Sequence, residues 1–252
     1  MGVIVDLDGV TVYRAAPTVA PRGAVIVIHE IWGLVPHIRD VADRFAAEGY
    51  LAIAPDILSD AGITPEVGAE LEALMRNSDE ATRTAAQPML REKLSASRSP
   101  EFAAEAVAKL MTVVDALAAE PGVDGRIGVT GYCFGGHYSF ELAVADDRVK
   151  AAVPFYGSPP ALDDVGRITC PVLALYGEID PPLMESLPAL RQAMTDAQID
   201  FADHVYPGAK HAFFNDTSAS VYDPDAAADA WARTLAFFDA HVAEGGVEVT
   251  QR

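Results

Sequence analysis

Cys133 lies in a glycine-rich turn of the kind that presents an enzyme nucleophile. The segment at 131–136 reads Gly-Tyr-Cys-Phe-Gly-Gly; an apolar run at 127–130 precedes it and a helical stretch follows. Glycine next to a nucleophile removes the Cβ clashes of a strained strand-to-helix turn, and the start of a helix favours a thiolate. We expect Cys133 to be the nucleophile; the alternative is a buried, unreactive cysteine.

An acid and a histidine follow Cys133 in the chain order that this type of turn requires. Asp180 lies just beyond the apolar run at 172–176, where a buried strand would end, and is a better candidate than Glu178. His211 follows a Pro-Gly turn and suits a base carried on a loop, whereas His204 falls within a strand pattern. We therefore expect a Cys133–His211–Asp180 triad.

The segment at 29–33, His-Glu-Ile-Trp-Gly, follows another apolar run and is the expected place for half of an oxyanion hole. The predicted donors are the backbone N–H groups of Ile31 and Phe134. A zinc motif His-Glu-x-x-His is excluded here because residue 33 is glycine. We expect neither a metal nor an organic cofactor.

The elements that must position these residues alternate along the chain. Buried strands are expected at 24–28, 51–54, 127–130, 151–153 and 172–176, and helices at 37–48, 101–119, 135–145, 183–197 and about 225–242. This alternation predicts an α/β fold with a mostly parallel central sheet and helices on both faces, built as one domain of residues 1–252.

The stretch at 59–100 is less regular, and helical fragments are expected between its prolines at 65, 88 and 100. We expect a lid or a pocket wall rather than a separate domain. Its arginines, Arg76, Arg83 and Arg91, are the candidates for holding a substrate carboxylate, although solvated helix faces are the commoner use of such residues.

The net charge of the chain limits the classes of partner that we expect it to bind. There are 18 Lys and Arg against 37 Asp and Glu, a formal charge of −19. Such a field repels nucleic acid and anionic membranes, and no apolar run reaches the roughly 18 residues that a membrane span needs. The two cysteines, Cys133 and Cys170, could form at most one disulfide. With acids rather than a basic signal in its first ten residues, the chain is expected to be cytoplasmic, a monomer or homodimer acting on a small molecule.

Five motifs together resemble the dienelactone hydrolase family, carboxymethylenebutenolidase-like members of the α/β-hydrolase superfamily. They are the segments at 29–33, 131–136, 177–180 (Gly-Glu-Ile-Asp), 207–213 (Pro-Gly-Ala-Lys-His-Ala-Phe) and 230–238. The resemblance covers about residues 3–242 and implies one α/β-hydrolase domain that opens an unsaturated lactone, or cleaves an ester, without a cofactor.

The same resemblance assigns roles. It implies that Cys133 attacks the lactone carbonyl and that Glu30 is an additional carboxylate that takes the thiol proton when substrate binds. A nearby carboxylate raises a thiol pKa, so Glu30 has to act as a base and not as a stabiliser of thiolate. Asn215 stands where lactone-cleaving members carry an arginine, four residues after the histidine. A neutral amide should discriminate less well for an anionic dienelactone.

Two other interpretations stay open. The start of the chain, with Asp6 and Asp8-Gly9, resembles the signature of Mg²⁺-dependent haloacid-dehalogenase-like phosphatases. A β-hairpin with its turn at Asp8-Gly9 is preferred. The third possibility is a catalytically silent hydrolase fold that binds a small molecule.

Overall fold

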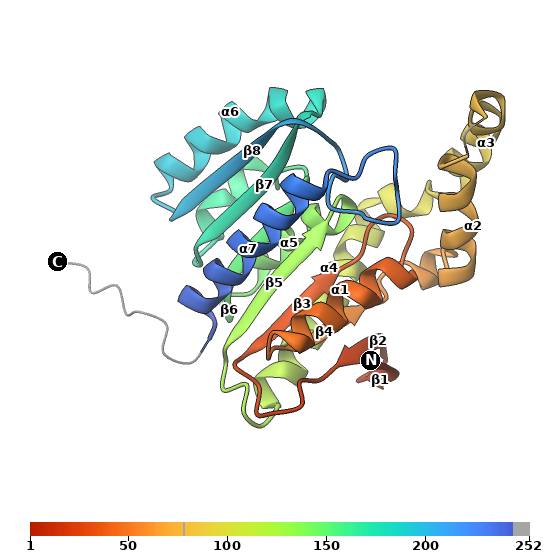
Figure 1. The fold of residues 1–252 in the computed structure, drawn as a ribbon. Helices are drawn as coiled ribbons and strands as arrows, with labels where there is room; N and C mark the ends of the chain where they lie inside the picture. The colour runs from red at the N-terminus through yellow and green to blue at the C-terminus, as the bar shows by residue number, and fades with distance from the viewer. Residues whose placement is uncertain (78, 244–252) are drawn as a thin grey trace.

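An eight-stranded sheet forms the centre of the protein in a computed structural model that describes residues 1–77 and 79–243 (Figure 1). The strand order is β1-β2-β4-β3-β5-β6-β7-β8. The six strands from β4 to β8 in this order are parallel: β4 (Leu51–Pro55), β3 (Ala24–Ile28), β5 (Ile127–Tyr132), β6 (Val149–Phe155), β7 (Val172–Ile179) and β8 (Phe201–Lys210). Strands β3, β4 and β5 are buried along their whole length, as expected for a sheet covered on both faces.

Helices cover the two faces of this sheet (Figure 1). On one face α1 (Pro36–Ala47) packs beside α7 (Pro224–His241), with the ring centroid of Phe45 4.6 Å from that of Trp231 and 5.9 Å from that of Phe238. On the other face lie α4 (Pro100–Ala119), α5 (Phe134–Ala145), the 3₁₀ segment η3 (Leu162–Arg167) and α6 (Pro181–Asp196). The mostly parallel, two-sided α/β architecture expected from the sequence is confirmed.

Strands β1 (Val3–Leu7) and β2 (Val10–Ala15) form the predicted hairpin, antiparallel to each other and to β4. Its turn has φ of 51° at Asp8 and 88° at Gly9, the left-handed pair that an Asp-Gly sequence supplies at low cost. Asp6 accepts a hydrogen bond from the Gly9 amide at 3.0 Å, so its carboxylate stabilises the turn. Asp6 and Asp8 are exposed on the edge hairpin.

The stretch at 59–100 contains η1 (Ser59–Ala61), α2 (Pro65–Met75), α3 (Glu80–Lys93) and η2 (Ala96–Arg98). The expected helix boundary at Pro88 is wrong, because α3 continues through this residue. Because proline has no N–H, the carbonyl of Thr84 loses its helical hydrogen-bond donor. Thr84 and Pro88 are both exposed, so water can donate to this carbonyl instead. Helices α2 and α3 project from the body of the domain (Figure 1).

The parallel strands bring their carboxyl ends to one edge of the sheet. β3 is followed by Glu30, β5 by Cys133, β7 by Asp180 and β8 by His211. The strand registers, such as Ile28 opposite Gly131, align these ends. The four candidate site residues thus come from four separate segments of the chain and lie at one edge of the sheet. Within the described part of the chain, no helix is both long enough and apolar enough to cross a membrane.

Candidate active site

Cys133 stands at the junction of β5 and α5 in a strained conformation, with φ 57° and ψ −111°. Positive φ in a non-glycine residue is a strained state that tight surroundings must enforce. The surroundings are tight: a Cβ on Gly131 would lie 2.1 Å from the carbonyl oxygen of Gly135, and one on Gly135 would lie 2.2 Å from that of Ile28. The glycines are therefore required by close backbone contacts, and they hold the thiol at the first turn of α5, half-buried rather than sealed in the core.

His211 receives its orientation from Asp180, whose Oδ2 lies 2.5 Å from the histidine Nδ1. Asp180 is buried, and this contact leaves Nε2 as the nitrogen available for proton exchange. Burial lowers the pKa of His211, but the hydrogen bond to Asp180 and the interaction with Cys133 outweigh burial and raise the pKa well above its usual value. The structure thus brings the three predicted triad residues together.

Glu30 is almost wholly buried and carries one side-chain hydrogen bond, from Asn215 Nδ2 to its Oε2 at 2.7 Å. Burial, helped by the charge of Glu72, raises the pKa of Glu30 from 4.5 to about 7. The Asn215 hydrogen bond and the charges of Arg76 and His211 act in the opposite direction. Glu30 can therefore change its charge near neutral pH, beside the histidine that contacts Cys133.

The two predicted oxyanion-hole donors lie on backbone that meets at this turn. Phe134 is the first residue of α5, so its amide has no partner within the helix, and Ile31 follows Glu30 in the loop after β3. The 2.2 Å separation of the Gly135 Cβ position from the Ile28 oxygen shows how closely this loop approaches the helix start. The buried His29 ring stacks on Phe134, with centroids 6.1 Å apart and planes 3° apart.

Both ring nitrogens of His29 bind backbone groups, which gives this residue a structural role. Its Nε2 accepts from the Ile57 amide at 3.2 Å, which places the proton on Nδ1, 2.7 Å from the Glu30 carbonyl oxygen. Burial lowers the pKa of His29, which keeps the ring neutral. Among residues 1–77 and 79–243, no group of three or more His, Cys, Asp or Glu side chains could hold a metal ion.

Tyr156 is a site residue that the sequence analysis missed. It directly follows β6, has φ of 37°, and its ring centroid lies 5.1 Å from that of His211. Its buried hydroxyl has no hydrogen-bond partner among the described residues. Burial, followed by the charge of Glu30, raises the pKa of Tyr156 far above its usual value. The available signal was its place at the carboxyl end of a strand, shared with Cys133 and Asp180.

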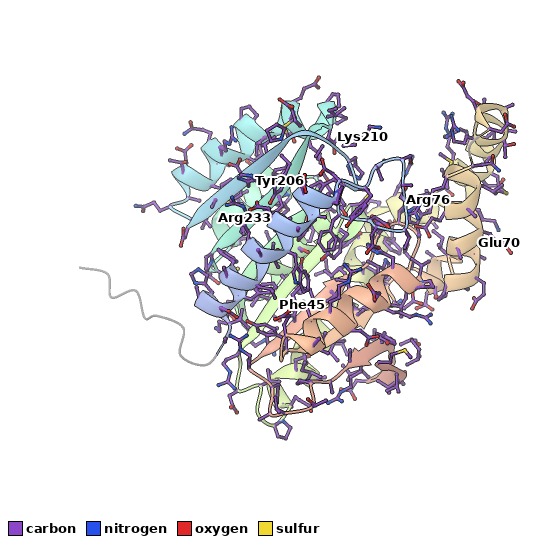
Figure 2. The ribbon with its side chains drawn as sticks, viewed as in Figure 1. Phe45, Glu70, Arg76, Tyr206, Lys210 and Arg233 are labelled. Atoms are coloured by element: carbon purple, nitrogen blue, oxygen red, sulfur yellow. The ribbon has the colours of Figure 1, made fainter. Side chains whose placement is uncertain are left out.

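A cavity of about 680 Å³ lies between the end of α2, α3 and the segment after β8. Arg76 from α2, Arg83 from α3 and Lys210 from the end of β8 line it, and Figure 2 labels Arg76 and Lys210. Two of the three arginines proposed from the sequence thus line this cavity, while Arg91 is exposed and does not line it. The residues that line the cavity do not include Cys133, Asp180 or His211. His204 lies elsewhere, within β8, with its ring 4.5 Å from that of Tyr206.

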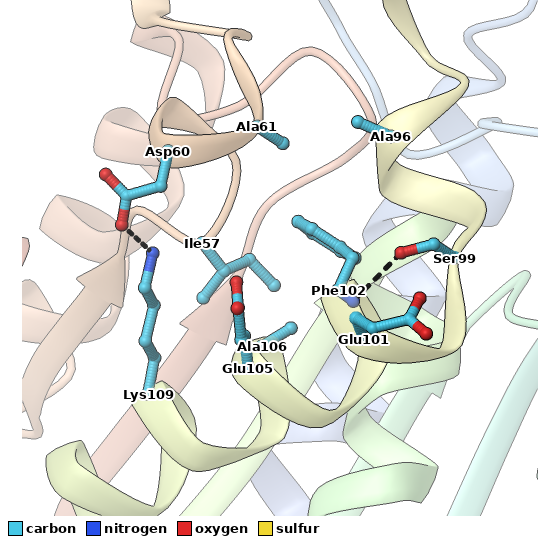
Figure 3. Close-up of a pocket in the computed structure, with 10 residues that line it drawn as sticks. All are labelled: Ile57, Asp60, Ala61, Ala96, Ser99, Glu101, Phe102, Glu105, Ala106 and Lys109. Atoms are coloured by element: carbon cyan, nitrogen blue, oxygen red, sulfur yellow. Dashed lines mark hydrogen bonds and ion pairs between the residues drawn. The ribbon is translucent and has the colours of Figure 1, made fainter.

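A smaller pocket of about 210 Å³ lies between η1, η2 and the start of α4 (Figure 3). Its floor is apolar, including Ile57 and Phe102, and Lys109 is paired with Asp60 at 2.5 Å on its rim. Phe102 packs against Phe134 with centroids 6.1 Å apart, so this pocket borders the support of the nucleophile turn.

Comparisons with known proteins identify the family and the fold of the chain. The profile of the dienelactone hydrolase family matches residues 10–242. A "Putative carboxymethylenebutenolidase" of Saccharolobus solfataricus is 33% identical over 92% of this chain and 95% of its own length. A protein of the same description from Salmonella typhimurium is 32% identical, covering 92% of this chain and 83% of the relative.

A crystal structure described as a "Putative Dienelactone Hydrolase" from Klebsiella pneumoniae superposes with a TM-score of 0.77 at 33% identity. The match covers 94% of this chain and 97% of that one. The chain therefore belongs to the dienelactone hydrolase family, with an α/β-hydrolase fold and hydrolysis of esters or lactones as its class of reaction.

Proposed function

We propose that the protein hydrolyses a lactone or carboxylic ester through a thioester on Cys133, with His211, Asp180 and Glu30 handling the protons. The observation that carries this proposal is the pairing of His211 Nδ1 with Asp180 Oδ2 at 2.5 Å, next to a thiol held on a strained turn. A nucleophile, a base and a group that orients the base are the minimum for acyl transfer.

Glu30 starts the cycle in this proposal. Part of the raised pKa of His211 comes from the charge of Cys133, so the imidazolium is most stable when a thiolate lies beside it. In this cycle His211 is the acid for the leaving group, and Glu30 is the acceptor for the thiol proton. Glu30 is ionised in about half of the molecules near pH 7, the value to which burial raises its pKa. The carboxylate takes the proton from Cys133 Sγ, which leaves a thiolate next to the His211 imidazolium.

The thiolate then attacks the carbonyl carbon of the substrate. A new S–C bond forms while the carbonyl π electrons move onto oxygen, and the amides of Ile31 and Phe134 stabilise this oxyanion. When the oxyanion collapses, the bond to the leaving oxygen breaks and that oxygen takes a proton from His211. The product of this half is a thioester on Cys133, and in a lactone the leaving oxygen stays attached to the acyl chain.

Water completes the reaction. Neutral His211 takes a proton from water, the hydroxide attacks the thioester carbonyl, and the same backbone amides stabilise the second oxyanion. Collapse releases the carboxylic acid and returns the sulfur as thiolate, which recovers a proton from Glu30. Every proton carrier in this cycle is a side chain of the site, so no metal or organic cofactor is proposed.

The setting proposed for this chemistry is the cytoplasm. Both cysteines are free, and a reducing compartment preserves a catalytic thiol. The substrate is a small molecule, and the charge of −19 argues against nucleic acid or anionic membranes as partners. The chain acts as a monomer or a homodimer in this proposal.

Assays of a panel of unsaturated lactones and activated aryl esters test the function. Cys133→Ala should abolish turnover, whereas the matched control Cys170→Ala, at a buried cysteine just before β7, should keep it. Mg²⁺-dependent phosphatase activity lost in Asp6→Asn would instead support the phosphatase alternative. A stable complex with a lactone and no turnover would support the binding-protein alternative.

A further inference from the structure

A chain of hydrogen bonds leads from Arg76, the C-cap residue of α2, to the buried carboxyl of Glu30. Arg76 Nη1 donates to Thr217 Oγ1 at 2.6 Å, and Thr217 Oγ1 donates to Asn215 Oδ1 at 2.7 Å. Asn215 Nδ2 then donates to Glu30 Oε2 at 2.7 Å. The four residues come from three separate parts of the sequence and form one continuous path.

The direction of this path is fixed by the chemistry of its members. A guanidinium can only donate, so the Thr217 hydroxyl accepts from Arg76 and must turn its own hydrogen toward Asn215. Asn215 Oδ1 also accepts from the Thr217 amide at 3.1 Å, and these two donors turn the amide nitrogen toward Glu30. Every donor thus points toward the carboxyl, which favours its charged form.

Ion pairs hold the path in its middle and at its outer end. Asp216, between Asn215 and Thr217, pairs with Arg44 and lies 3.4 Å from His37 Nδ1, both on α1. Arg76 is held by Glu72 on its own helix, with a nitrogen-to-oxygen distance of 2.5 Å. The two loop residues therefore have little freedom to leave the path.

We propose that Thr217 and Asn215 are positioning residues, which carry the positive potential of Arg76 to Glu30 and keep its carboxyl ready to accept the Cys133 proton. This inference rests on the proposed role of Glu30 as the thiol base. It gives Asn215 a use of its own as a neutral, oriented donor.

The charged and titratable groups that interact with Glu30 come from several elements of the fold. The set comprises Glu72 and Arg76 on α2, His211 after β8, Tyr132 at the end of β5 and Tyr156 after β6. Burial and Glu72 raise the pKa of Glu30, while Asn215, Arg76 and His211 lower it. Removing the donor path leaves the first two effects unbalanced, so Glu30 should then hold its proton to higher pH.

The test is Thr217→Val, which keeps the shape of the side chain but removes the hydroxyl. The pH dependence of kcat/KM should shift its acid limb upward by roughly 0.5–1 pH unit, with kcat at high pH retained. Arg76→Gln should shift it in the same direction, and Thr217→Ser should restore the original limb. The matched control is Thr112→Val, which removes a hydroxyl bonded to the Ala108 carbonyl on α4.

A second measurement reads Glu30 directly. The ¹³C chemical shift of its carboxyl carbon, identified by its loss in Glu30→Gln, should titrate at higher pH in Thr217→Val than in the parent. An unchanged titration in Thr217→Val, or a Thr217→Ser variant that behaves like Thr217→Val, would overturn the proposal. Because this readout needs no turnover, an unchanged titration with an inactive Cys133→Ala rejects the path alone. A shifted titration with an active Cys133→Ala rejects the proposed function instead.

Discussion

Glu30 and Asn215 lie 185 positions apart in the chain, yet a hydrogen bond of 2.7 Å joins their buried side chains. An arginine at position 215 would neutralise a carboxylate by ion pairing, whereas an amide only donates a hydrogen bond. Burial therefore dominates, and the pKa of Glu30 rises to about 7. The carboxyl changes charge in the range where the enzyme is expected to work, which has consequences for stability and for rate.

Glu30 should make the protein less stable as the pH rises. The folded state binds its proton more tightly than the unfolded state, with a pKa of about 7 against 4.5. The free energy of unfolding should therefore fall between those two values and level off above them. Glu30→Gln keeps an acceptor for Asn215 but removes this penalty, so its stability advantage should grow by about 2–3 kcal/mol from pH 5 to pH 8. Urea unfolding at both pH values measures this; an equal difference at each would contradict it.

Activity should depend on Glu30 in its ionised form. We expect the acid limb of kcat/KM to fall near pH 7, the pKa of the buried carboxyl. In Glu30→Gln this limb should disappear and kcat/KM at neutral pH should fall by about 100-fold or more. A stopped assay from pH 5 to pH 9 provides the profile. Retention of the acid limb in the variant would assign it to another group.

Asp180→Asn should damage the base without unfolding the protein. The loss of the Asp180 contact removes one cause of the raised pKa of His211, so the imidazolium should be lost at lower pH and the alkaline limb should move down. We expect kcat to fall by about 100-fold or more, because the ring also loses its orientation. Glu178→Gln is the matched control, since Glu178 is exposed and accepts only the Gly208 amide at 2.8 Å. Equal losses in both variants would argue against a special role for Asp180.

Cys133→Ser should retain the fold and lose most activity, on the order of 10²–10⁴-fold, because a hydroxyl is far harder to deprotonate than a thiol. Circular dichroism and thermal unfolding check the fold, and ester turnover checks the loss. A fully active serine variant would mean that Cys133 is only a structural residue.

Gly135→Ala should be destabilising because its Cβ would lie 2.2 Å from the Ile28 carbonyl oxygen. The loop after β3 and the first turn of α5 would have to separate, at a cost of about 2 kcal/mol or more. Gly166→Ala is the matched control, since a Cβ there meets nothing within 4 Å. Denaturant midpoints compare the stabilities of the two variants. Similar midpoints would show that the loop after β3 and the start of α5 can separate at little cost.

Local patterns in the sequence were sufficient to predict the strands at the centre of the sheet, although not all of their ends. β3 spans the predicted 24–28, since this unbroken apolar run, β-branched from Val25 onward, is typical of a fully buried strand. β6 extends to 149–155, beyond the predicted 151–153, because Lys150 and Pro154 interrupt the apolar pattern although the backbone continues. Pro88 failed as a helix boundary because it lies at an exposed position where water compensates for the missing hydrogen bond.

Some features of the candidate site could be predicted from the sequence and others could not. The order of Cys133, Asp180 and His211 and their places at strand ends could be predicted, because parallel strands must collect these ends at one edge. The contact of Asn215 with Glu30 and that of Arg76 with Thr217 could not, since each joins loops or helices whose packing no local pattern encodes. Tyr156 was missed because an aromatic residue after a strand is usually part of the core.

The most direct test of the account is to find the acyl group on the enzyme. An activated aryl ester mixed with the protein and quenched in acid should add the acyl mass to the tryptic peptide that contains Cys133. The adduct should be absent from Cys133→Ala. It should accumulate in His211→Asn, because an activated aryl leaving group departs without a proton from His211 whereas deacylation needs this base. Turnover of the ester with the acyl mass on another residue, or with undiminished activity in Cys133→Ala, would contradict the account.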